Sequence, residues 1–153
     1  HVGVDRICAA AGALPGRARH AIIVDAGSAI TVDLVLDRRF LGGLIMPGPQ
    51  MMLGALHHFT AQLPDLDWAE VRADAFDDTA PAMHTGAAVG SAGAIEAAVR
   101  LLKGNAPGTR IPVWLTGGHA KRLCSRLPSG WKYMPNLTLV GLADIARQNS
   151  RAR

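Results

Sequence analysis

Long apolar runs, aromatic residues and cysteines are all scarce in this sequence of 153 residues. A helix that crosses a bilayer needs about 20 consecutive apolar residues, and no run reaches that length. Aromatic residues are 5% of the chain and no block of Lys and Arg is interleaved with them, which argues against a nucleic-acid-binding surface. The 2 cysteines, Cys8 and Cys124, have no metal-binding spacing and require no disulfide. We therefore predict a cytoplasmic protein with no membrane segment and no nucleic-acid partner.

What the chain does contain is typical of one globular domain. Hydrophobic residues make up 49% and charged residues 18%, which is enough to bury a core and too apolar for a disordered segment. The formal net charge is +4, and a mildly basic surface suits anionic small molecules such as nucleotides. The abrupt opening at His1 leads us to expect the C-terminal half of a longer protein.

Three strands are expected in quick succession, over Ala21–Asp25, Ala29–Leu36 and Phe40–Ile45. Apolar residues at the even positions of the second strand alternate with Thr31, Asp33 and Val35. This period of two predicts a sheet with one apolar face. Because both connections are short, the three strands should form an antiparallel meander.

Helices are expected on either side of this meander. Ile7–Ala13 is Ala-rich and should form a short helix, and a second helix follows Pro47-Gly48-Pro49, since proline is tolerated in a first turn. The spacing of its apolar positions predicts one buried face, made of Met52, Leu56, Phe59 and Leu63, before Pro64. The acidic segment Asp65–Asp78 is expected to be a loop.

The second half of the chain should alternate helix and strand. The expected elements are a helix over Pro81–Lys103, a strand over Ile111–Leu115, a helix over Ala120–Leu127, a short strand near Trp131–Met134, and a last helix with Leu139, Leu142, Ile145 and Ala146 inward. Glycine inside a helix costs about 1 kcal/mol relative to alanine. We therefore expect Gly86, Gly90 and Gly93 to permit close approach of another backbone, either the sheet or a partner helix. A meander followed by alternating helices and strands indicates an α/β domain of the actin-like (ribonuclease-H-like) order.

The stretch Asp25-Ala26-Gly27-Ser28 joins the first two strands. Phosphoryl transfer requires hydrogen-bond donors and cations arranged around the phosphates. Gly27 permits close approach to the backbone, Ser28 offers a hydroxyl, and Asp25 can hold a cation. The same residues also suit an ordinary hairpin turn.

Near the start of the chain, Gly3-Val4-Asp5-Arg6 places an acid beside a guanidinium. Asp5 could accept a proton from a substrate hydroxyl while Arg6 holds an anionic group. The alternative is an acid at a helix N-terminus beside a solvated arginine.

Two glycine-rich stretches complete the set. Gly42-Gly43-Leu44-Ile45-Met46-Pro47-Gly48 could let a ligand or another backbone approach, or could simply bend a strand end. Thr116-Gly117-Gly118 follows a buried strand and precedes a helix, where free N–H groups and the helix dipole suit a nucleotide phosphate or ribose. Any connection from a strand to a helix favours glycine, however, so this pattern alone is weak.

In this order, the four stretches resemble those of the type III pantothenate kinases, the Bvg accessory factor family. Thr79 with Gly86, and Gly141-Leu142, extend the resemblance over almost the whole chain. The resemblance implies an acetate-and-sugar-kinase, actin-like fold and ATP-dependent phosphorylation of pantothenate to 4'-phosphopantothenate, the first step of coenzyme A synthesis. It also implies a homodimer with pantothenate near the subunit interface.

The resemblance implies roles for particular residues. Asp5 is the general base for the pantothenate hydroxyl, and the residues lining the pantothenate site are Gly3, Val4, Asp5, Arg6 and Thr79. Asp25 is the ligand of a monovalent cation, K⁺ or NH₄⁺, beside ATP with Mg²⁺. The nucleotide-binding residues are Gly27, Ser28, Thr116, Gly117 and Gly118, with Ser28 standing where a threonine is usual.

The family's first domain, with its Asp-x-Gly-Asn-Thr phosphate loop, has no counterpart in the sequence. We therefore predict that residues 1–153 form a single C-terminal domain of a two-domain kinase, and that this chain is an incomplete half. The alternative function is that of a non-catalytic regulatory or ligand-binding relative, similar to a Bvg accessory factor, which keeps the glycines as requirements of the fold.

Overall fold

A computed structural model describes residues 2–70 and 74–151 and has a five-stranded mixed sheet at its centre, in the order β3-β2-β1-β4-β5. The strands are β1 (Ala21–Ala26), β2 (Ala29–Leu36), β3 (Arg39–Pro47), β4 (Val113–Thr116) and β5 (Lys132–Tyr133). The helices are α1 (Val4–Gly12), α2 (Pro49–Phe59), α3 (Thr79–Gly104), α4 (Ala120–Leu123) and α5 (Leu137–Arg151), with 3₁₀ turns η1 (Trp68–Glu70) and η2 (Cys124–Arg126). The predicted meander and the later alternation of helices and strands are confirmed.

The sheet brings the ends of two distant strands together. β1 pairs antiparallel with β2 and parallel with β4, so that Asp25 lies between Thr31 on one side and Thr116 on the other. β1 and β4 are parallel, so their carboxyl ends share one edge of the sheet, where ligands of open α/β sheets bind. Two of the stretches singled out in the sequence therefore meet at this edge.

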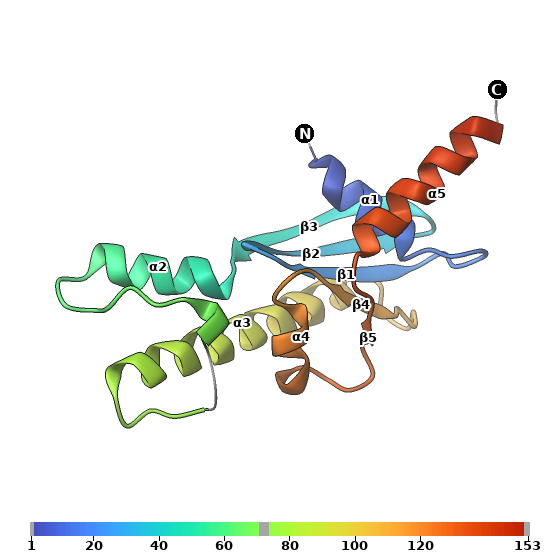
Figure 1. Ribbon diagram of the computed structural model, residues 1–153. Coiled ribbons are helices and arrows are strands. Elements are labelled where there is room, and N and C mark those ends of the chain that lie inside the picture. Colours follow the sequence, from blue (N-terminus) through green and yellow to red (C-terminus); the bar gives the residue numbers. More distant parts are fainter. Residues whose placement is uncertain (1, 71–73, 152–153) are drawn as a thin grey trace.

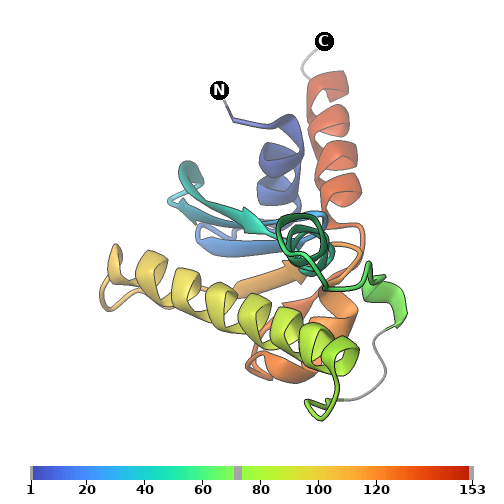
Figure 2. The same ribbon diagram turned by 90° about the vertical axis from the view of Figure 1, so that its left-hand side faces the viewer.

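Helices cover both faces of the sheet: α3 and α4 lie on one side, and α1 and α5 on the other (Figures 1 and 2). Ile22 and Val32 point into the core beneath α3, whereas Ile23 and Val35 point toward α1. The prediction of a single apolar face is wrong, because α1 buries the second face as well. Asp33, expected on a solvated face, is only 1% exposed.

Helix α2 is shorter and less buried than the apolar spacing predicts. It ends at Phe59, and Leu53 is its fully buried apolar residue. Leu56 and Phe59, expected to face the core, are 38% and 81% exposed. The helix extends beyond the end of the sheet (Figure 1), so only its first turns reach the core.

Helix α5 also buries a different face from the one predicted. Leu139 and Leu142 are exposed, whereas Leu137 and Gly141 are buried. The reason is a close crossing of α5 and α1, at which a Cβ on Gly141 would overlap the carbonyl oxygen of Cys8. The face of α5 that carries Gly141 fits this close crossing, whereas the side chains of a leucine-bearing face would keep the two helices apart.

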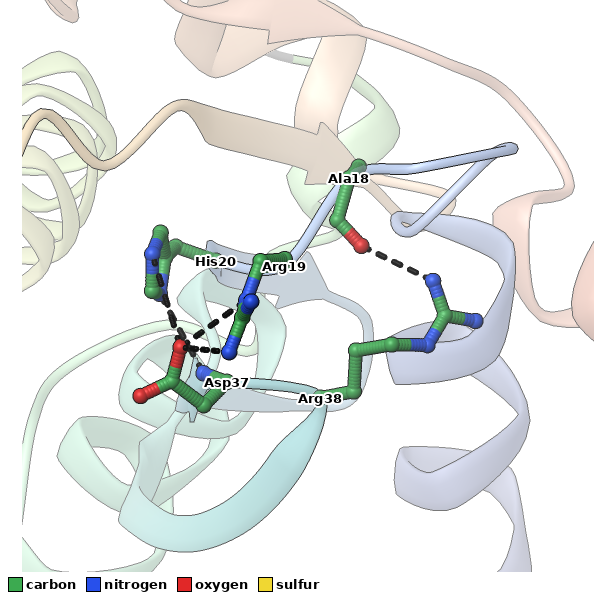
Figure 3. Close-up of polar contacts among 5 residues, drawn as sticks. All are labelled: Ala18, Arg19, His20, Asp37 and Arg38. Carbon is green, nitrogen blue, oxygen red and sulfur yellow. Dashed lines mark hydrogen bonds and ion pairs between the residues drawn. The ribbon is translucent and has the colours of Figure 1, made fainter.

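The turn between β2 and β3 lies at the opposite end of the sheet from Gly27-Ser28 and is fixed by polar contacts (Figure 3). Asp37 and Arg38 have φ values of 50° and 61°, the left-handed conformation of a tight hairpin. Arg19 Nε donates to Asp37 Oδ1 at 3.0 Å, and Arg38 Nη1 donates to the carbonyl oxygen of Ala18 at 2.8 Å. These exposed pairs anchor the turn far from the carboxyl edge of β1.

The other predicted elements are found with small shifts. The first helix starts at Val4, earlier than expected, and the long helix starts at Thr79. The segment expected as a loop, 65–78, contains η1, and its residues 71–73 lie outside the described residues. Within the described parts of the chain, none of the helices is both long and apolar enough to span a membrane.

Candidate functional site

The first turn of α1 presents Asp5 at the surface. Gly3 is the N-cap, and Val4 and Asp5 are exposed. The Asp5 carboxylate folds back over Gly3, where a Cβ would overlap its Oδ1 atom. Among the described residues no hydrogen bond or ion pair engages Asp5, so its carboxylate is available to a ligand.

Arg6, the next residue, is held by the protein itself. Its Nε atom lies 3.1 Å from both carboxylate oxygens of Asp33, and its Nη2 atom also contacts Asp33. The hydrogen bond that Arg6 donates to Asp33 raises the pKa of Arg6, against the opposing effect of burial, and the negative charges of Asp33 and Asp5 add to the rise. The alternative of a solvated arginine is therefore wrong: the anionic group that Arg6 holds here is a buried side chain.

Asp25 lies close to both other acids. Burial, the largest cause, raises the pKa of Asp25, and the negative charges of Asp5 and Asp33 raise it further. Three carboxylates therefore act on one another here, and the Arg6 guanidinium interacts with two of them, Asp33 and Asp5. A cation beside Asp25 would relieve this excess of negative charge.

The turn after Asp25 packs directly against the start of α2. The N–H of Gly48 donates to the carbonyl oxygen of Ser28 at 3.0 Å, and a Cβ on Gly48 would overlap the carbonyl oxygen of Gly27. Of the two interpretations of the Gly42–Gly48 stretch, close approach of another backbone is thus observed at Gly48. The Ser28 side chain is exposed, so its hydroxyl faces solvent.

The Thr116-Gly117-Gly118 turn lies against Asp25. Gly117 has a φ of 100°, and a Cβ there would overlap Asp25 Oδ1. Thr116 is buried, and its hydroxyl accepts a hydrogen bond from the N–H of Leu137 at 3.3 Å. The side chain of Thr116 thus caps α5, while Gly118 is exposed.

The predicted helix dipole is weak at this turn, because the α-helix that follows ends at Leu123 instead of Leu127. A helix this short carries little macrodipole. What remains is a cavity of about 390 Å³ that joins the two stretches, lined by Asp25, Thr116, Gly117, Gly118, Lys121, Tyr133, Pro135, Asn136, Thr138 and Leu139.

A second hollow lies beside Ser28. It has a volume of about 880 Å³ and is lined by Ser28, Gln50, Met51, Asp65, Leu66, Asp67, Glu70 and His119. Burial lowers the pKa of His119, the charge of Arg122 lowers it further, and Asp67 opposes this. Although three acids line the hollow, no group of three metal-ligating side chains with suitable geometry occurs among residues 2–70 and 74–151.

Thr79 lies apart from these residues. It opens α3, on the opposite face of the sheet from α1 (Figure 1), and its N–H donates to Asp78 Oδ1 at 2.6 Å. It lines an apolar groove of about 1040 Å³ between α2 and α3, together with residues that include Met52, Phe59 and Met83. Among the cavities described here for residues 2–70 and 74–151, therefore, Thr79 lines this groove and Asp5 does not.

Sequence reasoning missed Asp33. Its position in an alternating strand pattern suggested solvent, and nothing local indicates that α1 covers that face. The sequence did contain one indication: Asp33 is a single acid inside an apolar strand, and Arg6 is a single arginine in an apolar helix. Because a buried charge requires a partner, these two residues could have been predicted to pair.

Comparison with known proteins gives consistent matches. A family model described as Type III pantothenate kinase matches residues 1–101. The Type III pantothenate kinase of Nitrosospira multiformis is 39% identical over 154 residues, covering 97% of this chain and 56% of that protein. The Type III pantothenate kinase of Herminiimonas arsenicoxydans is 36% identical over 150 residues, covering 95% of this chain and 57% of that protein. The chain thus spans about half the length of the curated relatives it matches.

Solved structures support the fold. A Campylobacter jejuni protein described as belonging to the Baf family of transcriptional activators has a TM-score of 0.65 and 28% identity, covering 98% of this chain and 66% of that one. The Alp12 filament structure has a TM-score of 0.59 at 11% identity, covering 94% of this chain and 53% of that one, which is a likeness of fold alone.

Proposed function

This chain belongs to the type III pantothenate kinase family, and we propose from that membership that it is part of an enzyme that phosphorylates pantothenate with ATP. The product is 4'-phosphopantothenate, the first intermediate of coenzyme A synthesis. The observation that carries the proposal is the Asp5 carboxylate, which has no ion-pair partner among the described residues and acts on Asp25, the residue that lies between two glycine-containing turns at the carboxyl edge of β1.

Asp5 is the general base in this proposal. As the pantothenate hydroxyl oxygen bonds to the γ-phosphorus, its proton passes to the Asp5 carboxylate and the bond from phosphorus to the ADP oxygen breaks. Gly3, Val4 and Arg6 line the pantothenate site beside this base. Thr79 contacts pantothenate only if a second subunit brings it there, because it lies on the other face of its own sheet.

The nucleotide binds, we infer, along the edge formed by Gly27, Ser28 and the turn Thr116–Gly118. The exposed Ser28 hydroxyl and the backbone near Gly118 supply donors to phosphate. ATP brings Mg²⁺, and Asp25 holds a monovalent cation, K⁺ or NH₄⁺. The charge balance fits a cation, since Asp25 lies near two further acids and its pKa is raised.

The Asp25→Asn variant tests this cation site through stability. A raised pKa means that ionised Asp25 opposes folding, whereas protonated Asp25 does not. The fold therefore has its full stability below the ordinary aspartate pKa of about 3.9 and loses part of it as the pH rises through the folded-state pKa of Asp25. In a buffer free of K⁺ and NH₄⁺, we expect the variant to be more stable than wild type by about 1 kcal/mol at pH 7, and equally stable at low pH.

Urea unfolding measures both effects. Adding K⁺ at constant ionic strength should stabilise the wild type and leave Asp25→Asn unchanged. A variant less stable than wild type at pH 7 without K⁺, or an equal response of both proteins to K⁺, would contradict the assignment of Asp25.

An activity assay tests the proposed function. Because the chain spans about half the length of its relatives, we propose that it is the C-terminal half of a two-domain kinase. The chain should form 4'-phosphopantothenate when fused to the N-terminal half of the Nitrosospira multiformis relative, and should be inactive alone. If the fused protein neither turns over nor binds pantothenate by calorimetry, the regulatory alternative replaces the enzyme.

We further propose a homodimer through α2 and α3. A Cβ at Gly86 or Gly93 would meet nothing within 4 Å, so the sheet is not the backbone that these glycines approach. Val89 and Leu101 on the same helix are 57% and 61% exposed, and an apolar groove lies between the first turns of α3 and α2. A partner helix on this face would bury these residues.

Sedimentation measures the assembly. We expect the chain to sediment as a dimer, and Val89→Glu to sediment as a monomer because it would bury a charge in the interface. A wild-type monomer at micromolar concentration would contradict the proposal.

A cytoplasmic location is proposed in keeping with ATP as substrate and with the free thiols of Cys8 and Cys124.

A further inference from the structure

Asp33 is an acidic residue in the middle of β2 that no step of the proposed reaction uses. It is 1% exposed, and α1 covers the face of the sheet from which it projects. Its partner is Arg6, which contacts the carboxylate through both Nε and Nη2. A buried charge is tolerated only with such a partner, so the two side chains form one unit.

Two neighbours fix the geometry of this unit. Gly43 on β3 lies opposite Asp33, and any Cβ there would overlap both the Val32 carbonyl oxygen and the Asp33 carboxylate. Phe40, on the same strand β3, has its ring centroid 5.6 Å from Arg6 Cζ. The absence of a side chain at Gly43 therefore makes room for the carboxylate, and Phe40 supports the guanidinium.

Arg6 has two carboxylates within electrostatic reach, Asp33 and Asp5, but forms an ion pair with Asp33. Asp5 directly precedes Arg6 in the chain. Because Asp33 takes Arg6, Asp5 keeps no ion-pair partner among the described residues. The Nη1 atom of Arg6 likewise has no partner there, and the Arg6 side chain is 14% exposed.

We propose that Asp33 is a positioning residue for the substrate: it holds Arg6 by one edge, so that the guanidinium stays off Asp5 and its free Nη1 atom meets the pantothenate carboxylate. This inference rests on the proposed function. Arginine suits the role because its planar group can bind two anions at once, which a lysine ammonium cannot do with the same geometry.

The main experiment separates positioning from stability by steady-state kinetics of the fused two-domain enzyme. We expect Asp33→Asn to raise the KM for pantothenate by about 30-fold and to leave the KM for ATP within about twofold of wild type. Arg6→Lys should do the same. If Asp33 acts through Arg6, adding Asp33→Asn to Arg6→Lys should raise the pantothenate KM no further.

The matched control is Asp37→Asn, which breaks an arginine–aspartate pair at the opposite end of β2 (Figure 3). Asparagine accepts the left-handed conformation of Asp37, so this variant should bind both substrates like wild type. Arg6→Lys keeps a cation beside Asp33, so it provides the readout if Asp33→Asn does not fold.

The outcomes are distinct. A wild-type fusion that does not turn over pantothenate overturns the proposed function and this inference with it. If the wild-type fusion is active, three results would overturn the positioning role alone. The first is an unchanged pantothenate KM in Arg6→Lys or Asp33→Asn, and the second is an equal increase in the KM values for pantothenate and ATP. The third is that the effects of the two single variants multiply in the double variant.

Discussion

Replacing Asp5 with asparagine is expected to lower the turnover of pantothenate by about 10³-fold in the two-domain enzyme. Asparagine has nearly the same shape but cannot take up the hydroxyl proton as phosphoryl transfer proceeds. Because Asp5 is exposed and has no ion-pair partner among the described residues, the stability of the fold should change by less than about 1 kcal/mol.

The kinetic pattern identifies the role. We expect kcat to fall while the KM for ATP stays close to the wild-type value, since Asp5 belongs to α1 and not to the glycine turns that we propose bind the nucleotide. Asp37→Asn serves again as the same chemical change at an exposed site. Turnover within about tenfold of wild type would remove Asp5 from the role of general base.

The residues around Asp5 were predictable because their signals are local. Asp25-Ala26-Gly27-Ser28 turns between two strands in both the prediction and the structure, and Gly3-Val4-Asp5-Arg6 lies at the start of a helix that was predicted a few residues later. Likewise, the alternation in β2 and the apolar spacing in α3 each predict the secondary structure of a segment from the residues of that segment alone. The order of these elements was then enough to identify the α/β architecture.

The second face of the sheet was not predictable from these patterns. Alternation in β2 indicates which residues share a face, but it does not say what covers that face. Asp33 is buried because α1, 27 positions away in the sequence, packs across it through Arg6. Thr116 is a similar case, since its hydroxyl binds the N–H of Leu137 instead of facing a ligand.

The buried face of α5 was mispredicted for a related reason. Apolar spacing assumes that large side chains point toward the core. Here the neighbouring helix comes so close that a backbone atom occupies the position of a side chain: a Cβ on Gly141 would lie 2.7 Å from the N atom of Gly12. The Gly141-Leu142 pattern contributed to the family resemblance, and its physical reason is this crossing of α1 and α5.

Adding one methyl group at the crossing should therefore have a large effect. We expect Gly141→Ala to destabilise the chain by about 3 kcal/mol, because the new Cβ would overlap the Cys8 carbonyl oxygen and only a shift of one helix could relieve it. The intrinsic preference of helices for alanine, about 1 kcal/mol, acts in the opposite direction and is too small to compensate.

The control is Gly54→Ala in the interior of α2, where a Cβ would meet nothing within 4 Å. This variant should gain about 1 kcal/mol, so urea unfolding should move the two variants in opposite directions. Because α1 carries Asp5 and Arg6, displacing it at Gly141 should also weaken pantothenate binding under conditions where the variant stays folded. A Gly141→Ala protein as stable as Gly54→Ala would show that α1 and α5 do not cross this closely, and would remove the support that holds Asp5 at the carboxyl edge of β1.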